Sequence, residues 1–281
     1  MKHSLALRMG RSQSPSLVAG LAIVGLLGGL ALLSVFWTPY DPLVTNSADR
    51  FASPTWRHIL GTDQLGRDVL SIVIEGARTS LLAALVATSV AIVIGTTLGI
   101  FSAVASRWID GFVSAMVTAV VALPALLLAL VFAAARGPST ATAVTAIGIA
   151  TGASVAAVTR FEVDGIMRAP FVLASRFSGA STTLIVRRHV LRNLAPTLAV
   201  QSSGAASIAI IAESTLSYLG LGTPPPTPSW GRMLSATQQY LLVHPLLTLW
   251  PAVFVCVAVL GFNLLGDGLR ERLDPTLTNY R

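Results

Sequence analysis

The sequence is short of charged residues, of lysine and of cysteine, and each shortage excludes something. Charged side chains make up 11% of the 281 residues, against about 25% in soluble domains. Because the other residues form long apolar runs, we expect an integral membrane protein. The net charge of +7 does not indicate nucleic-acid binding, since the basic residues cluster between the apolar runs, where the positive-inside rule places them.

Lysine and cysteine occur once each. A phosphate-binding P-loop needs a lysine directly after its glycines, and the only lysine is Lys2, so we expect no ATP-hydrolysing site of that kind here. The only cysteine, Cys256, excludes an intrachain disulfide and a cysteine-based metal site, and it is expected to be a small buried side chain. No nucleophile–base pair and no metal-ligand spacing is present, so we expect no catalytic residue, no metal site and no cofactor bound by this chain.

Six apolar segments are long enough to cross a membrane as helices, which predicts an all-α, polytopic membrane protein. Pro124 is expected to kink the third segment. The fourth is rich in alanine, threonine and glycine, which favours close packing against other helices. The predicted spans are 17–37, 80–105, 112–134, 141–158, 197–221 and 246–265.

The distribution of basic residues predicts the orientation. With the N-terminus inside, the inner segments hold thirteen lysine and arginine residues and the outer segments hold six. We therefore expect both termini in the cytoplasm. The predicted parts are a cytoplasmic N-terminus (1–16), a first transmembrane helix (17–37), an extracytoplasmic loop (38–79), a five-helix core (80–266) with a cytoplasmic loop (160–196), and a cytoplasmic C-terminal tail (267–281).

A basic segment, 160–193, separates the fourth and fifth predicted spans and holds six arginines. Pro170 is expected to begin a helix, Gly179 to end it in a left-handed turn, and Ser181 to cap a second helix. The second helix is expected to carry an apolar ridge beside a basic rim, formed by Leu184, Leu191, Leu194, Arg188 and Arg192. Such a pattern suits a helix that docks in a partner's groove, and equally a solvated loop that binds acidic lipid headgroups.

This segment resembles the cytoplasmic EAA loop of ABC importer permeases, the membrane subunits that pair with separate ATPases. In the oligopeptide, dipeptide and nickel subgroup the loop has Glu-Ala-Ala, a glycine six residues after the glutamate, and a His-x-Leu-Pro ending. Here Leu-Ala-Ser at 173–175, Gly179, and His-Val-Leu-Arg at 189–192 correspond, so the glutamate is replaced by Leu173. Further segments similar to this subgroup, and above all to its dipeptide "C" permeases, are 60–68, 76–81, 213–222, 228–234, 263–270 and 273–275.

The resemblance implies a bacterial inner-membrane permease that forms half of a pore for di- or oligopeptides. It implies a second homologous permease, ATP-binding subunits that carry ATP and Mg, and an extracytoplasmic substrate-binding protein as partners. Nickel chelates or haem are alternative cargoes, and an ATP-independent secondary transporter or channel is the alternative from a different class. The residues expected to couple the permease to the ATPases are Phe171, Leu173, Ala174, Ser175, Phe177, Gly179, Arg188 and His189.

Glu213 is the one acid within a predicted span, toward its outer side. Intramembrane acids usually face the bundle interior or a water-filled cavity, so Glu213 and Ser217 of the same motif are candidates for pore lining or gating. The alternative for Glu213 is a structural ion pair with an arginine such as Arg78 or Arg232.

Trp230 is expected either to contact cargo or seal the pore, or to anchor the chain at the membrane interface. Asp63, Arg67 and Asp68 form the outer-loop motif. Without histidine or cysteine neighbours at ligand spacing, helix capping and salt bridges explain these two acids better than a metal ion does.

Overall fold

The computed structural model describes residues 14–273, and within that range the only regular elements are helices, joined by turns and loops, with one isolated β-bridge between Thr62 and Asp68. Five helical runs are long and apolar enough to cross a membrane. They are α1 (Pro15–Phe36), α2 (Val69–Val104), α5 (Thr140–Met167), the run of α7 (Thr182–Ile185), a π-helical turn (Val186–Val190) and α8 (Leu191–Tyr218), and α10 (Pro245–Leu273). The prediction of an all-α, polytopic membrane protein is therefore confirmed.

The third predicted span is broken rather than kinked. It consists of α3 (Arg107–Ala122) and α4 (Ala125–Arg136), whose axes differ by 94°. Leu123 ends α3 with ψ 132°, the extended conformation that a following proline favours, and Pro124 has no backbone N–H with which to continue the helix. Counted as one broken crossing, the pair brings the number of spans to six.

The centre of the bundle is the contact between α2 and α5. Glycines on both helices allow the close approach, because a Cβ at Gly95 or Gly148 would lie 2.6 Å from a valine side chain of the other helix. In the most apolar stretch of α5, 67% of the residues are buried, against 17% in the corresponding stretch of α1. The expectation that the small residues of the fourth span serve helix packing is confirmed.

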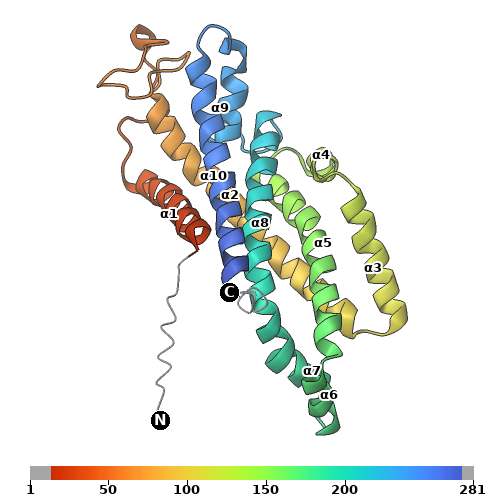
Figure 1. Cartoon of the computed structure of the whole chain (residues 1–281). Helices are drawn as coiled ribbons and strands as arrows, with labels where there is room; N and C mark the ends of the chain where they lie inside the picture. Colours follow the sequence, from red (N-terminus) through yellow and green to blue (C-terminus); the bar gives the residue numbers. More distant parts are fainter. Residues whose placement is uncertain (1–13, 274–281) are drawn as a thin grey trace, which may run out of the picture.

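The remaining elements flank this centre and define two ends of the molecule (Figure 1). α10 packs between α1 and α8. The loop end carries residues 37–68, α4 and α9 (Trp230–Thr237), with short 3₁₀ turns at Ser47–Asp49 and Gln238–Tyr240. The hairpin end carries α6 (Pro170–Phe177), α7 and the start of α3.

Several helices extend beyond the predicted spans. α2 begins at Val69 rather than near residue 80, because its first turns bury Val69, Ile72 and Val73 in the core. α5 continues to Met167 and α10 to Leu273, beyond the predicted ends at residues 158 and 265. Of the predicted terminal segments, 1–13 and 274–281 lie outside the described residues. Cys256, expected to be buried, is exposed on α10, whose apolar surface faces outward there.

Candidate functional sites: a basic hairpin and a buried polar cluster

The segment between α5 and α8 has the local structure that its proline, glycine and serine predict. Pro170 is the first residue of α6. Gly179 adopts a φ of +82°, a left-handed conformation that glycine reaches without a Cβ clash. The Ser181 hydroxyl accepts a hydrogen bond from the Leu184 N–H at 3.3 Å and caps the next helix. The predicted order of helix, glycine turn and helix is confirmed, and we call residues 168–193 the hairpin.

The second helix of the hairpin is not a separate element. It continues through the π-helical turn into α8, so the hairpin is joined directly to a membrane span. Beneath the hairpin lies a small core of its own, formed by Val163, Met167, Val172, Ile185, Val190 and Leu194. Leu194 was expected on the exposed ridge and is fully buried instead, since its side of the helix faces the end of α5.

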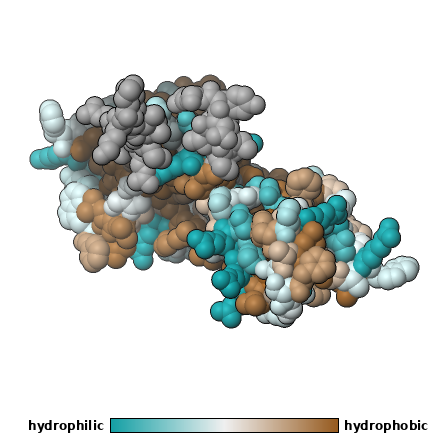
Figure 2. Space-filling view, turned by 60° about the horizontal axis from the view of Figure 1, so that its bottom comes forward, coloured by the Kyte–Doolittle hydropathy of each residue, from teal (hydrophilic) through white to brown (hydrophobic). Residues whose placement is uncertain are grey.

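The outward side of the hairpin combines large apolar side chains with arginines. Phe177 is 92% exposed, and only Val172 of α6 is buried. We define the hairpin surface by its exposed members Phe171, Leu173, Ala174, Phe177, Leu184 and Leu191, with Arg176, Arg187, Arg188 and Arg192. Figure 2, which turns this end of the molecule forward, shows hydrophobic and hydrophilic patches side by side.

His189 connects the two arms of the hairpin. Its Nε2 lies 3.1 Å from the Ser175 hydroxyl, and its ring centroid lies 5.6 Å from that of Phe171. Ser175 and Phe171 belong to α6, whereas His189 belongs to the π-helical turn. The histidine therefore fixes the position of α6 relative to the helix that continues into the membrane. It was expected to pack or hydrogen-bond at the contact with a partner, and the contacts seen here are within the chain.

Arg160, which the sequence groups with the basic segment, lies apart from the hairpin surface. Its Nε and Nη2 both donate to the Asp110 carboxylate at 2.6 Å, a bidentate pair between α5 and α3. The Ser102 hydroxyl at the end of α2 donates to the same carboxylate at 2.6 Å. Three helices thus meet at one carboxylate. Asp110 was not predicted as a site residue, because its partner is distant in the chain and its only signal is a lone acid at the start of an apolar helix.

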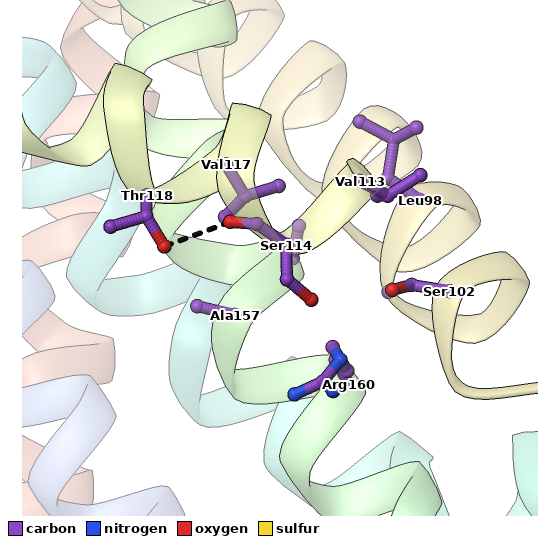
Figure 3. A pocket seen from close by; sticks show the side chains of 10 residues that line it. Leu98, Ser102, Val113, Ser114, Val117, Thr118, Ala157 and Arg160 are labelled. Atoms are coloured by element: carbon purple, nitrogen blue, oxygen red, sulfur yellow. Dashed lines mark hydrogen bonds between the residues drawn. The ribbon is translucent and has the colours of Figure 1, made fainter. Parts of the chain in front are cut away.

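A small cavity adjoins this ion pair (Figure 3). It has a volume of about 110 Å³ and lies between α2, α3 and α5. Its lining includes Ser102, Ser114 and Thr118, with Arg160 at one side. No residue of α3 is buried, so the Asp110–Arg160 pair is a principal attachment of that helix to the bundle.

Glu213 lies in a buried polar cluster near the end of α8. Glu213 is only 1% exposed, and its Oε1 accepts hydrogen bonds from the Ser217 and Thr223 hydroxyls at 2.7 and 3.4 Å. The ion pair with Arg78 or Arg232, one of the two alternatives for Glu213, is not formed. Arg78 approaches Glu75, and Arg232 donates to the Thr223 carbonyl. Ser217 also accepts the Thr223 N–H at 3.0 Å, so the cluster holds the turn after α8 in place.

Trp230 is part of the core rather than a surface anchor. The residue is fully buried, and its indole N–H donates to the Val73 carbonyl of α2 at 3.1 Å. Its backbone N–H donates to the Ser80 hydroxyl at 3.3 Å. Of the two alternatives for Trp230, the interfacial anchor is wrong, because α9 begins at Trp230 and packs against α2, which places the indole in the core. Trp230 therefore joins the segment after the Glu213 cluster to the centre of the bundle.

The outer-loop motif is structural in its contacts. Asp68 caps α2 by accepting the Ser71 N–H at 2.8 Å and also contacts the His58 ring at 2.9 Å. Asp63 forms an ion pair with Arg67 at 2.6 Å. These contacts agree with the expected capping and salt bridges. Within residues 14–273 no group of three or more His, Cys, Asp or Glu side chains is placed to hold a metal ion.

A wider groove of about 470 Å³ opens at the loop end between the first half of α2 and the first turns of α5. Its apolar wall includes Leu82, Val86 and Val144. Glu75 and Arg78 line its polar part and approach each other at 3.7 Å, too far for a hydrogen bond. Glu213, Ser217 and Trp230 do not line this groove or the smaller cavity.

Comparison with known proteins places this arrangement among transport proteins. Residues 95–279 match the family model described as "Binding-protein-dependent transport system inner membrane component". The chain is 31% identical over 257 residues to the nickel transport system permease protein NikC of Escherichia coli (strain K12), covering 92% of this chain and 93% of the relative.

Two other relatives carry names of peptide transport systems or of a peptide-like cargo. The di/tripeptide transport system permease protein DppC of Pseudomonas aeruginosa (strain UCBPP-PA14) is 35% identical over 270 residues, covering 91% of this chain and 89% of the relative. The glutathione transport system permease protein GsiD of Salmonella typhimurium is 36% identical over 274 residues, covering 96% and 89%. The matches extend over nearly the whole chain, so they include the hairpin, the polar cluster and the outer-loop motif.

Proposed function

Because this chain belongs to the family of binding-protein-dependent transport system inner membrane components, we propose that it forms half of the translocation pore of an ATP-driven importer for di- and oligopeptides. A second homologous permease completes the pore, and a substrate-binding protein delivers the cargo. ATP and Mg are held by separate ATP-binding subunits. The lack of any lysine other than Lys2 supports this division, since a P-loop requires a lysine.

The observation that carries the proposal is the hairpin surface. A segment that exposes phenylalanines to water is expected to bind a partner, because clustered large apolar side chains on a surface mark an interaction site. The residues proposed to meet the ATP-binding subunit are Phe171, Leu173, Ala174, Ser175, Phe177, Gly179, Arg188 and His189. His189 and the hairpin core then transmit a displacement of α6 to the helix that continues into the membrane.

The path from the hairpin into the membrane is a continuous helix. α8 begins at Leu191 and ends at Tyr218, a length of about 42 Å at helical rise. The Glu213 cluster lies near its far end and is hydrogen-bonded to the turn that leads to α9. We assign Glu213 and Ser217 to positioning that turn, and Trp230 to fixing it against α2. A tilt of α8 therefore moves the loop end together with the hairpin, which is what a two-state pore requires.

The proposed orientation puts the hairpin end in the cytoplasm of a bacterial inner membrane, with both termini on that side. Arginines support it: among the described residues they lie at the start of α3 (Arg107), at the end of α5 (Arg160, Arg168), in the hairpin (Arg176, Arg187, Arg188, Arg192) and in the last turn of α10 (Arg270, Arg272). The loop end holds six, of which Arg67 and Arg78 approach acidic residues. Excess arginine on one side of the spans is the signal that orients membrane proteins.

The proposal is tested by reconstituting the chain in proteoliposomes together with the second homologous permease, the ATP-binding subunits and the substrate-binding protein. Uptake of labelled dipeptide that requires ATP and every subunit is the expected result. Uptake by this chain alone, without ATP or a partner, contradicts the proposal and favours a secondary transporter or channel.

Nickel is a second candidate cargo, favoured by the likeness to a nickel permease. The same proteoliposomes loaded with a chelated nickel ion test it directly. Neither cavity of this chain is lined by a histidine or cysteine side chain, and the described residues form no cluster that would hold a metal. We expect peptide uptake to exceed nickel uptake, because the likeness to the di/tripeptide and glutathione permeases favours a peptide cargo.

A further inference from the structure

The groove between α2 and α5 has a polar mouth that carries both signs of charge. Glu75 and Arg78 lie in the first three turns of α2, three residues apart and therefore on one face of the helix. Their side chains are 22% and 43% exposed, so both charged groups remain in contact with water. At 3.7 Å the carboxylate and the guanidinium attract each other without a hydrogen bond between them. Each group is therefore available to a ligand.

Two acids just before this pair differ from it, because their oxygens are used to hold the chain in place. Asp63 forms a close ion pair with Arg67 at 2.6 Å. Asp68 caps α2 by accepting the Ser71 N–H at 2.8 Å. The pair at the mouth of the groove lies within a single helix and joins no separate elements, and exposed ion pairs of this kind contribute little to stability. Its placement beside a groove therefore calls for a reason other than folding.

Behind the polar mouth the groove is apolar and large enough for a small molecule. Its volume of about 470 Å³ lies within the range of about 300–1,000 Å³ that ligand sites occupy. Leu82 and Val86 follow Arg78 along the same side of α2, one and two helical turns further on. Val144 of α5 and Thr227 of the turn before α9 complete the lining. The groove therefore offers charge at its mouth and an apolar wall behind it.

Opposite charges at one mouth fit a ligand that is itself a zwitterion. A dipeptide with free ends carries an ammonium and a carboxylate, joined by about 7 Å of extended chain. The Cβ atoms of residues three apart on a helix are about 5–6 Å apart, so Glu75 and Arg78 have the spacing to meet both ends of one dipeptide. A site for a free anion would gather guanidinium groups alone, and a site for a metal ion would gather carboxylates or imidazoles.

We propose that this groove is a binding subsite for the dipeptide cargo within the permease. Glu75 accepts hydrogen bonds from the ammonium group of the peptide, and Arg78 donates to its carboxylate. The side chains of the peptide pack against Leu82 and Val86. Because Arg78 lies about 4.5 Å further along α2 than Glu75, the carboxylate end of the peptide lies deeper in the groove. The subsite rests on the proposed function and adds a cargo contact made by this chain itself.

The single cysteine of the chain makes the subsite measurable without a binding protein. In a Cys256→Ser background, Leu82→Cys places one thiol on the groove wall. The complex of both permeases and the ATP-binding subunits, in lipid nanodiscs, is treated with a water-soluble methanethiosulfonate at rising dipeptide concentrations. Labelling of this chain, followed by mass spectrometry, should slow as the peptide fills the groove, and its concentration dependence gives the affinity. Trp56→Cys, on the exposed outer loop, is the control and should label at one rate throughout.

Changes to the ligand and to the protein together identify the two contacts. N-acetylation removes the ammonium and C-terminal amidation removes the carboxylate, and each should lower the affinity at least about tenfold. With Glu75→Gln, acetylation should make no further difference while amidation still does, and with Arg78→Gln the reverse is expected. A merely structural role would not pair one ligand group with one side chain. Asp164→Asn, which breaks an exposed ion pair at the other end of the molecule, is the matched control and should leave every affinity unchanged.

The outcomes separate the subsite from the proposed function. Protection that depends on both ends of the peptide, one through each residue, supports the subsite. Labelling that the peptide does not slow, or losses that are the same in the glutamine variants as in the wild type, overturns the subsite. A thiol at residue 82 that stays unreactive without peptide would mean that another subunit or lipid fills the groove, which also overturns it. In each of these cases the proposed function stands if the complete transporter takes up dipeptide with ATP, and it fails if no uptake occurs.

Discussion

Breaking the Asp110–Arg160 ion pair should loosen α3 more than any other membrane helix. Both guanidinium–carboxylate bonds measure 2.6 Å, and the pair joins a helix without a buried residue to the central helix α5. The substitution Arg160→Gln leaves the Asp110 carboxylate with the Ser102 and Ser114 hydroxyls alone.

The expected cost follows from the burial of the two side chains, which are 42% and 26% exposed. Exposed ion pairs contribute about 0–1 kcal/mol, whereas removing one partner of a buried pair costs about 3–5 kcal/mol. A partly exposed bidentate pair lies between these limits. We expect Arg160→Gln to lower the free energy of unfolding by about 2 kcal/mol, or roughly thirtyfold in the equilibrium constant.

The assay is a double-mutant cycle with Arg160→Gln, Asp110→Asn and both together, measured by equilibrium unfolding in mixed micelles. Hydrogen exchange of the same proteins locates the effect, and faster exchange is expected in residues 107–122 than in α2. Arg168→Gln, which removes an exposed pair with Asp164, is the matched control. A coupling energy near zero, or exchange that rises equally in all helices, would refute the argument that this pair attaches α3.

Three further substitutions test other parts of the structure. Gly179→Ala should lower the free energy of unfolding by about 1–2 kcal/mol and reduce ATP-dependent uptake, because a φ of +82° strains any residue with a Cβ. Gly25→Ala, which adds its Cβ in open space on α1, is the control, and equal uptake by the two variants would contradict the role of the turn. Glu213→Ala should lower the free energy of unfolding by about 1–3 kcal/mol, since it removes the acceptor of two hydroxyls in a buried site. Glu271→Ala, exposed on α10, should change it by less than about 0.5 kcal/mol, and identical melting of the two variants would contradict a stabilising role for Glu213. Trp230→Ala should lower the free energy of unfolding by about 3–5 kcal/mol, and Trp56→Ala on the exposed loop is its control. Equal stability of the two variants would mean that α9 does not depend on the buried indole.

The spans were predictable because length and apolar composition leave few alternatives for a segment such as Pro15–Phe36. The hairpin was also predictable, since Pro170, Gly179 and Ser181 act through local backbone geometry. In both cases the determining interactions lie within a few residues of one another along the chain.

The features that escaped prediction depend on contacts between distant residues. Pro124 predicts a bend but not its size, which is set by how α4 packs on α5. Arg160 looks like its neighbours until Asp110 is placed beside it. Trp230 has the composition of an interface anchor, and only the return of α9 onto α2 buries it. An ion pair with an arginine was one of two alternatives for Glu213, which is held instead by hydroxyls of its own helix and the following turn.

The central claim is that the hairpin lies in the cytoplasm under the cover of an ATP-binding subunit. Replacing Cys256, the one exposed thiol, with serine and then introducing Phe177→Cys gives a single reporter on the hairpin surface. A maleimide that does not cross membranes should label it in inside-out vesicles stripped of the ATP-binding subunit, and much more slowly once that subunit is restored. Labelling in right-side-out vesicles, or labelling that the restored subunit leaves unchanged, would contradict the claim.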